Sequence, residues 1–267
     1  MVYNMWFIDS HAHLNDSAFD NDRDTVISAC FAADVKQMIE IACETNEWQP
    51  AVELCKKYQG QIYAAAAVHP INASQLTEES LQELKKYLAL DVFKAVGEIG
   101  LDYFYEDSSP RPLQQNVLEQ QLDLAQNIKK PIILHCRKSK QEQDFSAYED
   151  MFAILNNFNL SGGILHCFSG RKEDAYRALD KGFYLGINGI IGYKKNDDIR
   201  QIIKQVGLKY LLLETDCPYL PPQSKRGQRN SPVNIPEIAK NLADILGVTV
   251  QEVADITTQN SKAFYNI

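Results

Sequence analysis

The sequence has little positive charge and no long apolar run, and each shortage excludes a class of protein. Its 267 residues carry 27 Lys and Arg against 35 Asp and Glu, which gives a formal net charge of −8. This balance argues against binding to nucleic acid or anionic membranes through general positive charge, although it is compatible with a local basic loop. Because no apolar run reaches the ~20 residues of a membrane span, we expect no membrane association.

Cysteine is also sparse, and its distribution indicates a reducing compartment. The six cysteines are spread along the chain, and the N-terminal residues run straight into an apolar segment without a secretory signal pattern. We therefore expect a cytoplasmic protein with free thiols that pack as small buried side chains. Nothing in the sequence points to an obligate protein partner.

Short apolar runs alternate with amphipathic stretches at intervals of roughly 30 residues, the size of a βα unit. The expected strands are Trp6–Ser10, Gln37–Ala42, Ile62–Val68, Ala95–Ile99, Ile132–Cys136, Gly163–Cys167, Phe183–Asn188 and Tyr210–Thr215. The expected helices include Arg23–Ala33, Trp48–Lys57, Glu78–Leu88, Gln115–Asn127, Lys172–Lys181, Ile235–Leu246 and Val250–Tyr265. Near-continuous apolar runs are typical of parallel strands that are buried on both faces.

Eight such units fit a closed parallel barrel, whose usual length is about 250 residues. We therefore expect an α/β fold, a TIM (β/α)8 barrel, in which residues 1–267 form a single domain. An open doubly wound sheet is the alternative, but it would spread the strand ends along one edge. Thr249 is expected to cap the last helix, with Glu252 completing a capping box.

The histidines are few, and all of them lie at the ends of expected strands. They are His11, His13, His69, His135 and His166, and two acidic residues at further strand ends are Glu98 and Asp216. Imidazole and carboxylate are the ligands of catalytic zinc, manganese and related ions. Because active sites of such barrels form at the carboxyl ends of the strands, the distribution predicts one metal site there.

Strand alternation sorts the candidate ligands from their neighbours. His11 and His13 are two residues apart on an extended segment, so both side chains point the same way and can chelate one ion. Cys136, Cys167 and Cys217 each directly follow a candidate ligand and are expected to point away from the site. We therefore do not count these cysteines as ligands.

Six ligands are too many for one catalytic ion and suit two ions about 3.5–4 Å apart. The expected partition places His11, His13 and Asp216 on one ion, His135 and His166 on the other, and Glu98 between them as a bridge. A water between the ions would then be the nucleophile, with Asp216 as general base. The imidazoles argue against a pure magnesium site, while zinc, manganese and similar ions remain open.

Other polar residues near the strand ends are candidates for binding substrate. His69 either contacts a substrate oxygen or is a structural histidine. Guanidinium groups bind phosphate or carboxylate, and Arg137 lies two residues after His135. The loop Pro218–Pro232 carries the cations Lys225, Arg226 and Arg229. The aromatic residues Tyr103, Phe104 and Tyr105 either stack on bases or pack within their loop.

These motifs, taken together, resemble a known family. F-I-D-S-H-A-H-L, G-E-I-G-L-D-Y-F, I-L-H-C-R, I-L-H-C-F-S-G, L-L-L-E-T-D-C-P-Y-L and R-G-Q-R-N-S-P are similar to motifs of the TatD family of metal-dependent deoxyribonucleases, within the amidohydrolase superfamily. The resemblance runs in order over essentially the whole chain. It implies a TIM barrel with two divalent metal ions, and DNA as the substrate of a 3′-to-5′ exonuclease. The ligands that it implies are His11, His13, Glu98, His135, His166 and Asp216.

The chain departs from the family pattern after Arg137. Members usually carry an acidic and a small residue there, whereas this chain has Lys138 and Ser139, followed by the polar stretch Lys140–Asp150. Substrate details implied by the family are therefore least secure at this stretch.

Two further interpretations remain. The first is a hydrolase of an amide or ester, such as an aminoacyl ester. Related barrels with that activity often bridge their metals with a carbamylated lysine, so Glu98 and the cationic final loop favour the nuclease. The second is a non-enzymatic protein with a structural metal. Structural zinc sites are closed and rich in cysteine, unlike this set of residues.

Overall fold

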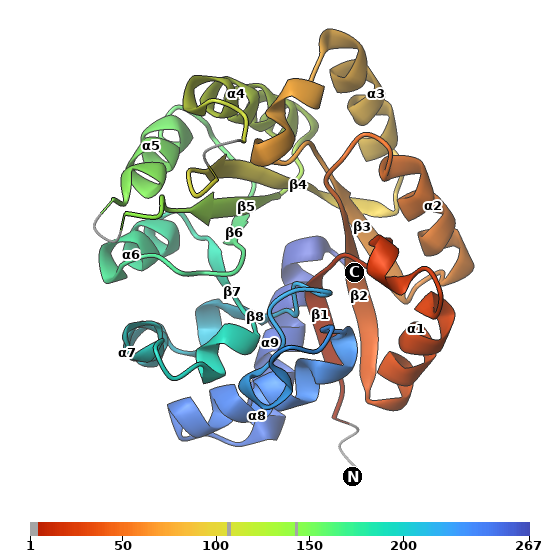
Figure 1. The fold of residues 1–267 in the computed structure, drawn as a ribbon, viewed down its shortest axis with the longest axis vertical. Coiled ribbons are helices and arrows are strands. Elements are labelled where there is room, and N and C mark those ends of the chain that lie inside the picture. The colour runs from red at the N-terminus through yellow and green to blue at the C-terminus, as the bar shows by residue number, and fades with distance from the viewer. Residues whose placement is uncertain (1–4, 106–107, 142–143) are drawn as a thin grey trace.

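The computed structural model describes residues 5–105, 108–141 and 144–267, and its strands form one eight-stranded parallel sheet. The strands are β1 (Phe7–Ala12), β2 (Val35–Ala42), β3 (Ile62–Ala66), β4 (Phe93–Asp102), β5 (Ile132–Arg137), β6 (Gly163–Leu165), β7 (Tyr184–Ile187) and β8 (Leu211–Leu213). They follow one another around a ring in chain order (Figure 1). All eight expected strands are present, which confirms the prediction of a TIM barrel.

Backbone hydrogen bonds between the first strand and the segment after the last strand bring the two ends of the sheet together. The amide of Asp216 donates to the carbonyl of His11, and the amide of His13 donates to the carbonyl of Cys217, each at 2.9 Å. Ala12 and Cys217 form a parallel bridge. This contact excludes the open doubly wound sheet, in which the first and last strands would not meet.

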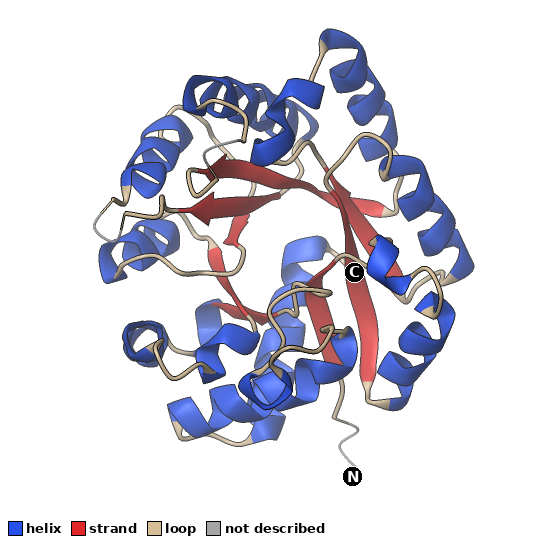
Figure 2. Cartoon of the chain, viewed as in Figure 1, coloured by secondary structure: helices blue, strands red, loops and turns tan. Residues whose placement is uncertain are grey.

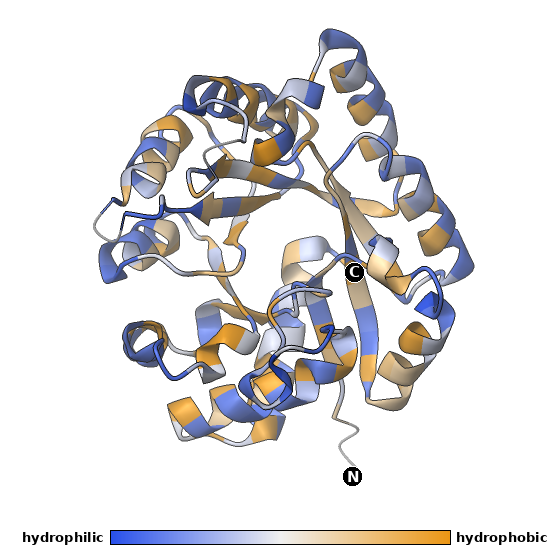
Figure 3. Cartoon of the chain, in the orientation of Figure 1, coloured by the Kyte–Doolittle hydropathy of each residue, from blue (hydrophilic) through white to orange (hydrophobic). Residues whose placement is uncertain are grey.

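Helices surround the strands, as Figure 2 shows. They are α1 (Arg23–Ala32), α2 (Trp48–Lys57), α3 (Glu78–Leu88), α4 (Arg111–Ile128), α5 (Ser146–Leu155), α6 (Lys172–Asp180), α7 (Asp197–Val206), α8 (Ile235–Leu246) and α9 (Val250–Tyr265). Hydrophobic and hydrophilic residues alternate along them (Figure 3), as amphipathic helices require. Among the described residues, no helix has both the length and the apolar composition to cross a membrane.

Two apolar layers hold the barrel. The larger layer lies between strands and helices, where the indole of the buried Trp48 donates to the carbonyl of Ala67 at 3.1 Å. The smaller layer fills the barrel, and it consists of Ile39, Ile41, Ala65, Ala95, Ile133, Ile164, Leu212 and Tyr265. Tyr265 reaches this layer from the end of α9, and its hydroxyl donates to the carbonyl of Ser10 at 2.8 Å. The barrel interior is therefore a packed core, and only its carboxyl end is available for chemistry.

Local signals for α9 are confirmed in detail. The hydroxyl of Thr249 accepts the amide of Glu252 at 3.1 Å, while the carboxylate of Glu252 accepts the amide of Thr249 at 2.8 Å. The expected capping box is therefore present. Of the polar stretch Lys140–Asp150, residues 142–143 lie outside the described residues, and the part from Ser146 onward begins α5.

At the end that carries the site, the bounds of every strand except β2 differ from expectation by one to three residues. For example, β1 continues to Ala12, whereas β6 ends at Leu165 and β8 ends at Leu213. β8 stops early because the amide of Thr215 donates to the carboxylate of Asp9 at 2.9 Å instead of joining the ladder. Side chains thus replace backbone partners where the strands open into the site.

Candidate metal centre

Glu98, on β4, lies at the centre of the candidate site, with imidazoles from four other segments around its carboxylate. Its Oε1 lies 2.6 Å from Nδ1 of His135 and 3.6 Å from Nε2 of both His69 and His166. Its Oε2 lies 3.3 Å from Nε2 of His11. The structure therefore brings together residues that are spread over 155 positions of the chain, from 11 to 166.

The H-x-H pair acts as one unit in space. Nε2 of His11 and Nε2 of His13 are 3.3 Å apart. Oδ1 of Asp216 lies 3.4 Å from Nε2 of His13 and 3.8 Å from Nε2 of His11. The shared direction predicted for the two imidazoles is therefore confirmed. Candidate donor atoms of His11, His13 and Glu98 all lie within 4.8 Å of one another, close enough to hold one ion.

The remaining imidazoles group differently from the expected partition. His69, Glu98 and His135 form a second set of donors within 4.8 Å, because β3 and β5 flank β4 in the barrel. His166 instead stacks on His11, with ring centroids 3.5 Å apart, whereas its centroid is 6.4 Å from that of His135. The assignment of each imidazole to a particular ion stays a prediction.

Mutual electrostatics keep the two central carboxyl groups ionised. Burial opposes the ionisation of Glu98, but the facing imidazoles of His166 and His11 hold its pKa well below the usual value. Burial likewise opposes the ionisation of Asp216, whose pKa the imidazoles of His166 and His13 lower overall. Both groups therefore offer charged oxygen atoms to a cation.

The imidazoles divide into two electrostatic classes. Burial lowers the pKa of His11 and of His69, which favours the neutral form that ligates metal. Burial acts the same way on His135, but the carboxylates of Asp102 and Glu98 raise its pKa to about 10. Against the same burial, Glu214 and Glu98 raise the pKa of His166 to about 9. A cation that binds at these two histidines must displace a proton from each.

Two buried acids behind the histidines escaped the sequence analysis as site residues. Oδ2 of Asp102 lies 3.0 Å from Nε2 of His135, and Oε1 of Glu214 lies 3.1 Å from Nδ1 of His166. Gly186 makes room for Glu214, because a Cβ at that glycine would lie 2.2 Å from Oε2. The sequence signal for both is their place at strand ends, because Asp102 follows Glu98 by four residues in G-E-I-G-L-D and Glu214 precedes Asp216 by two in E-T-D.

Glu40, at the end of β2, is a third buried acid that sequence reasoning missed. Its two carboxylate oxygens accept the amides of Leu14 at 2.6 Å and Asn15 at 3.2 Å. These amides directly follow His13, so Glu40 holds the turn that carries this imidazole. Burial raises the pKa of Glu40 to about 8.

His69 and the cysteines are placed clearly by their hydrogen bonds and burial. Nδ1 of His69 accepts the amide of Ile71 at 3.2 Å, which leaves Nε2 to carry the proton toward Glu98. Its role in catalysis stays a prediction. All six cysteines are free, and within the described residues none belongs to a group of three potential ligands.

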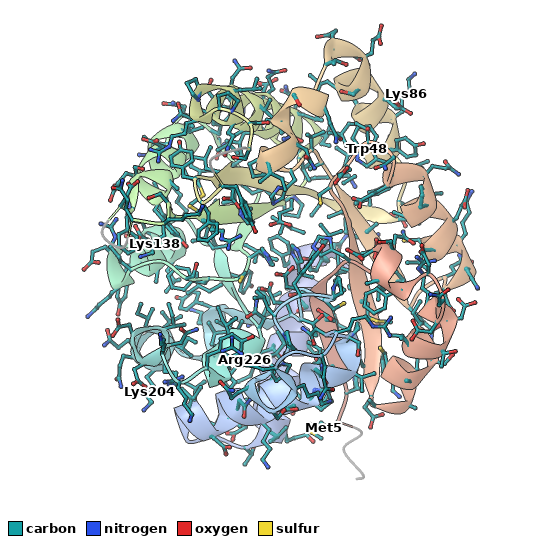
Figure 4. The ribbon with its side chains drawn as sticks, viewed as in Figure 1. Met5, Trp48, Lys86, Lys138, Lys204 and Arg226 are labelled. Atoms are coloured by element: carbon teal, nitrogen blue, oxygen red, sulfur yellow. The ribbon has the colours of Figure 1, made fainter. Side chains whose placement is uncertain are left out.

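The four cations expected to bind substrate are held differently. Arg137 stacks its guanidinium on Phe104 at 3.9 Å from the ring centroid. Arg226, on the loop after β8, lies 4.7 Å from the ring centroid of Tyr193, and Figure 4 places it beside the barrel opening. Lys225 donates to the side chain of Asn234, while Arg229 donates twice to Asp22, at 2.8 and 2.6 Å. The charge of Arg229 is thus already paired, whereas Arg137 and Arg226 face aromatic rings.

A closed β/α barrel with imidazoles and carboxylates at its carboxyl end defines a class, the metal-dependent hydrolases with an amidohydrolase-like fold. Comparison with known proteins agrees. A family model described as TatD related DNase matches residues 8–266, and the chain belongs to this family.

Individual relatives are similar over their whole length. The chain is 36% identical to the uncharacterized metal-dependent hydrolase YabD of Bacillus subtilis, over 97% of this chain and 98% of the relative. It is 30% identical to the 3′-5′ ssDNA/RNA exonuclease TatD of Salmonella typhimurium, over 97% of this chain and 98% of the relative. Among solved structures, the TatD homolog YJJV of Escherichia coli K12 superimposes with a TM-score of 0.89 at 30% identity, covering 98% of each chain.

Proposed function

We propose that this protein is a metal-dependent phosphodiesterase that removes nucleotides from the 3′ end of single-stranded DNA. The position of Glu98 carries the proposal, because its carboxylate is shared by two of the three groups of potential ligands among the described residues, the third being His11, His166 and Asp216. A shared carboxylate is what a site for two neighbouring ions requires. The name of the Salmonella relative, 30% identical over nearly the whole chain, supports the choice of substrate.

The residues fit a pair of divalent ions such as zinc, manganese or magnesium. His11, His13 and one oxygen of Glu98 offer donors to one ion, with Asp216 beside them, and His135 with the other oxygen of Glu98 offers donors to a neighbouring ion. Nε2 of His166 lies between these groups, 3.6 Å from Glu98 and 3.9 Å from Asp216. Imidazole with carboxylate suits zinc, manganese and similar ions better than magnesium alone. When bound, such a pair supplies an acidified water as nucleophile and neutralises charge on the phosphate.

The side chains of this protein then have distinct tasks. Asp216 is ionised and borders the first donor set, so it accepts the proton that the attacking water loses. His69 carries its proton on Nε2 and faces the centre, so it donates to an oxygen of the substrate. Arg137 and Arg226 bind phosphate oxygens, with Lys225 nearby, whereas Arg229 fixes the loop through Asp22.

The test combines metal analysis with cleavage of labelled DNA. Single-stranded oligonucleotides labelled at the 5′ end are incubated with purified protein loaded with zinc, manganese or magnesium. We expect a ladder of products shortened from the 3′ end, and the variant Glu98→Gln is expected to reduce the rate roughly 100-fold or more. Glu173→Gln, which changes an exposed glutamate on α6, is the matched control and is expected to behave as the wild type.

Two results would contradict the proposal. Equal degradation by the Glu98→Gln variant would show that the nuclease activity comes from a contaminant. Faster turnover of an aminoacyl ester or a small amide, without any shortening of DNA, would assign the centre to amide or ester hydrolysis instead.

A further inference from the structure

Exposed aromatic side chains gather at the metal centre. Among the described residues, four large hydrophobic side chains are exposed: Leu90, Tyr105, Tyr176 and Tyr219. Leu90 follows α3 and Tyr176 lies on α6, on the helical exterior. Tyr105 and Tyr219, the most exposed of the four at 49% and 54%, instead follow β4 and β8 at the carboxyl end of the barrel. Single exposed aromatics are ordinary, but two beside one polar site point to a ligand.

Tyr219 stands beside the first donor set in a fixed position. Its ring centroid lies 6.1 Å from that of His13, at an interplanar angle of 71°. Its hydroxyl donates to Asp16 at 2.9 Å, and its carbonyl accepts the side-chain amide of Asn230 at 2.7 Å. The ring is thus held at both ends while more than half of its surface faces solvent, so a ligand would meet a rigid surface.

Tyr105 follows β4, the strand that carries Glu98, at the carboxyl end of the barrel. Its ring meets that of Phe104 edge to face, with centroids 5.1 Å apart. The guanidinium of Arg137 lies 5.0 Å from the ring centroid of Tyr105. Arg137 follows His135 by two residues, and its guanidinium also lies 3.9 Å from the ring centroid of Phe104. An aromatic surface with a guanidinium beside it suits a nucleotide, whose base stacks while its phosphate is bound.

We propose that Tyr105 and Tyr219 are stacking platforms for two bases of a single-stranded nucleic acid, one on each side of the metal centre. This inference rests on the proposed function and names the residues that hold its substrate. The net charge of −8 leaves little long-range attraction for a polyanion, so local stacking has to supply much of the affinity. Stacking does not depend on sequence, and the bases of a duplex are already stacked on one another. We therefore expect a preference for single strands without preference for sequence.

The kinetic test replaces each platform and compares it with an exposed tyrosine elsewhere. Tyr105→Ala and Tyr219→Ala are each expected to raise the KM for an oligothymidylate of about 12 nucleotides by roughly 5- to 100-fold, with kcat changed by less than about two-fold. Tyr105→Phe and Tyr219→Phe keep the ring and are expected to restore the KM. Tyr176→Ala, on α6, is the matched control and is expected to leave KM unchanged.

A binding test uses the same variants without turnover. The metal-loaded protein is titrated into a fluorescent oligothymidylate with phosphorothioate linkages, which resist hydrolysis, and into a matching strand whose 3′-terminal units lack bases. The alanine variants are expected to lose affinity for the normal strand only, since the strand without bases has nothing to stack.

The outcomes separate this inference from the proposed function. Binding that depends on Tyr105 and Tyr219 without cleavage would support the platforms and contradict the nuclease. Cleavage with an unchanged KM in both alanine variants would overturn the platforms and leave the nuclease standing. Equal losses on strands with and without bases would also overturn the platforms, because the tyrosines would then act only on loop structure.

Discussion

Asn230 ties the final loop to the segment that carries Asp216, so its removal tests how this half of the site is held. The side chain is fully buried. Its Nδ2 donates to the carbonyl of Thr215 at 2.9 Å and to that of Tyr219 at 2.7 Å, on either side of Asp216. Its Oδ1 accepts the side-chain amide of Asn234 at 2.7 Å. One amide group therefore fixes both ends of the turn from which Asp216 projects.

The variant Asn230→Ala removes these three bonds, together with the one that Oδ1 accepts from the amide of Ser231 at 2.9 Å, and it leaves two partners without access to water. The carbonyl of Thr215 and the amide of Asn234 belong to buried residues, whereas Tyr219 is half exposed and its carbonyl regains water. A buried partner left unsatisfied costs about 1–3 kcal/mol, so for two partners we expect a loss of about 2–6 kcal/mol in the free energy of unfolding. The neighbouring Arg229→Ala breaks a partly exposed ion pair with Asp22 and an exposed hydrogen bond to the carbonyl of Ala18, and it is expected to cost about 1 kcal/mol.

Urea unfolding followed by circular dichroism measures both variants, with the slope m expected to stay unchanged. Calorimetric titration with zinc is expected to show weaker binding in Asn230→Ala, because Asp216 loses its support. An Asn230→Ala protein within about 0.5 kcal/mol of the wild type would refute the reasoning. It would mean that water or the loop backbone satisfies the orphaned groups.

Three further changes test the supports behind the ligands. Gly186→Ala places a Cβ 2.2 Å from Glu214 and is expected to lower zinc affinity about 10- to 100-fold, whereas Gly192→Ala, whose nearest contact is 3.4 Å, is expected to change little in the same titration. Asp102→Asn removes the negative charge that faces Nε2 of His135 and is expected to reduce zinc affinity about 10- to 100-fold, measured by competition with a chelator. Unchanged zinc affinity would show that Asp102 does not support His135 as a ligand. The folded pKa of Glu40, about 8, lies above the usual 4.5, so the folded state keeps a proton that the unfolded chain releases. The contribution of Glu40 to stability is complete below about pH 4.5 and is lost as the pH rises through 8. Tm measured in EDTA is therefore expected to fall less steeply between these pH values in Glu40→Gln than in the wild type. An identical dependence of Tm on pH in both proteins would contradict the raised pKa of Glu40.

The fold could be predicted because its strands are buried on both faces. Runs such as Ile132–Cys136 stay apolar for their whole length, and amphipathic segments separate them at a constant interval. The strand ends could not be placed in the same way. Thr215 leaves the ladder because Asp9, 206 residues away in the chain, accepts its amide. A local pattern contains no trace of such a partner.

The position of the candidate ligands at strand ends could be predicted from the sequence. Which of them lie close enough to share one ion could not. Alternation along one strand is a local property, so the common direction of His11 and His13 followed from their spacing. The stacking of His166 on His11 depends instead on how far apart β1 and β6 lie across the barrel. Distances across a barrel are set by its closure, which no single segment encodes.

The acids behind the ligands explain why this site needs cations at all. Glu98, Asp102 and Glu214 are each no more than 3% exposed. Burying that many carboxyl groups is costly unless positive charge lies among them. Protonated His135 and His166 supply part of it, as their raised pKa values show, and divalent ions would supply more in the same space. Acidic residues at strand ends are therefore candidate site residues in the same way as the histidines. A sequence search that includes them identifies Asp102 and Glu214.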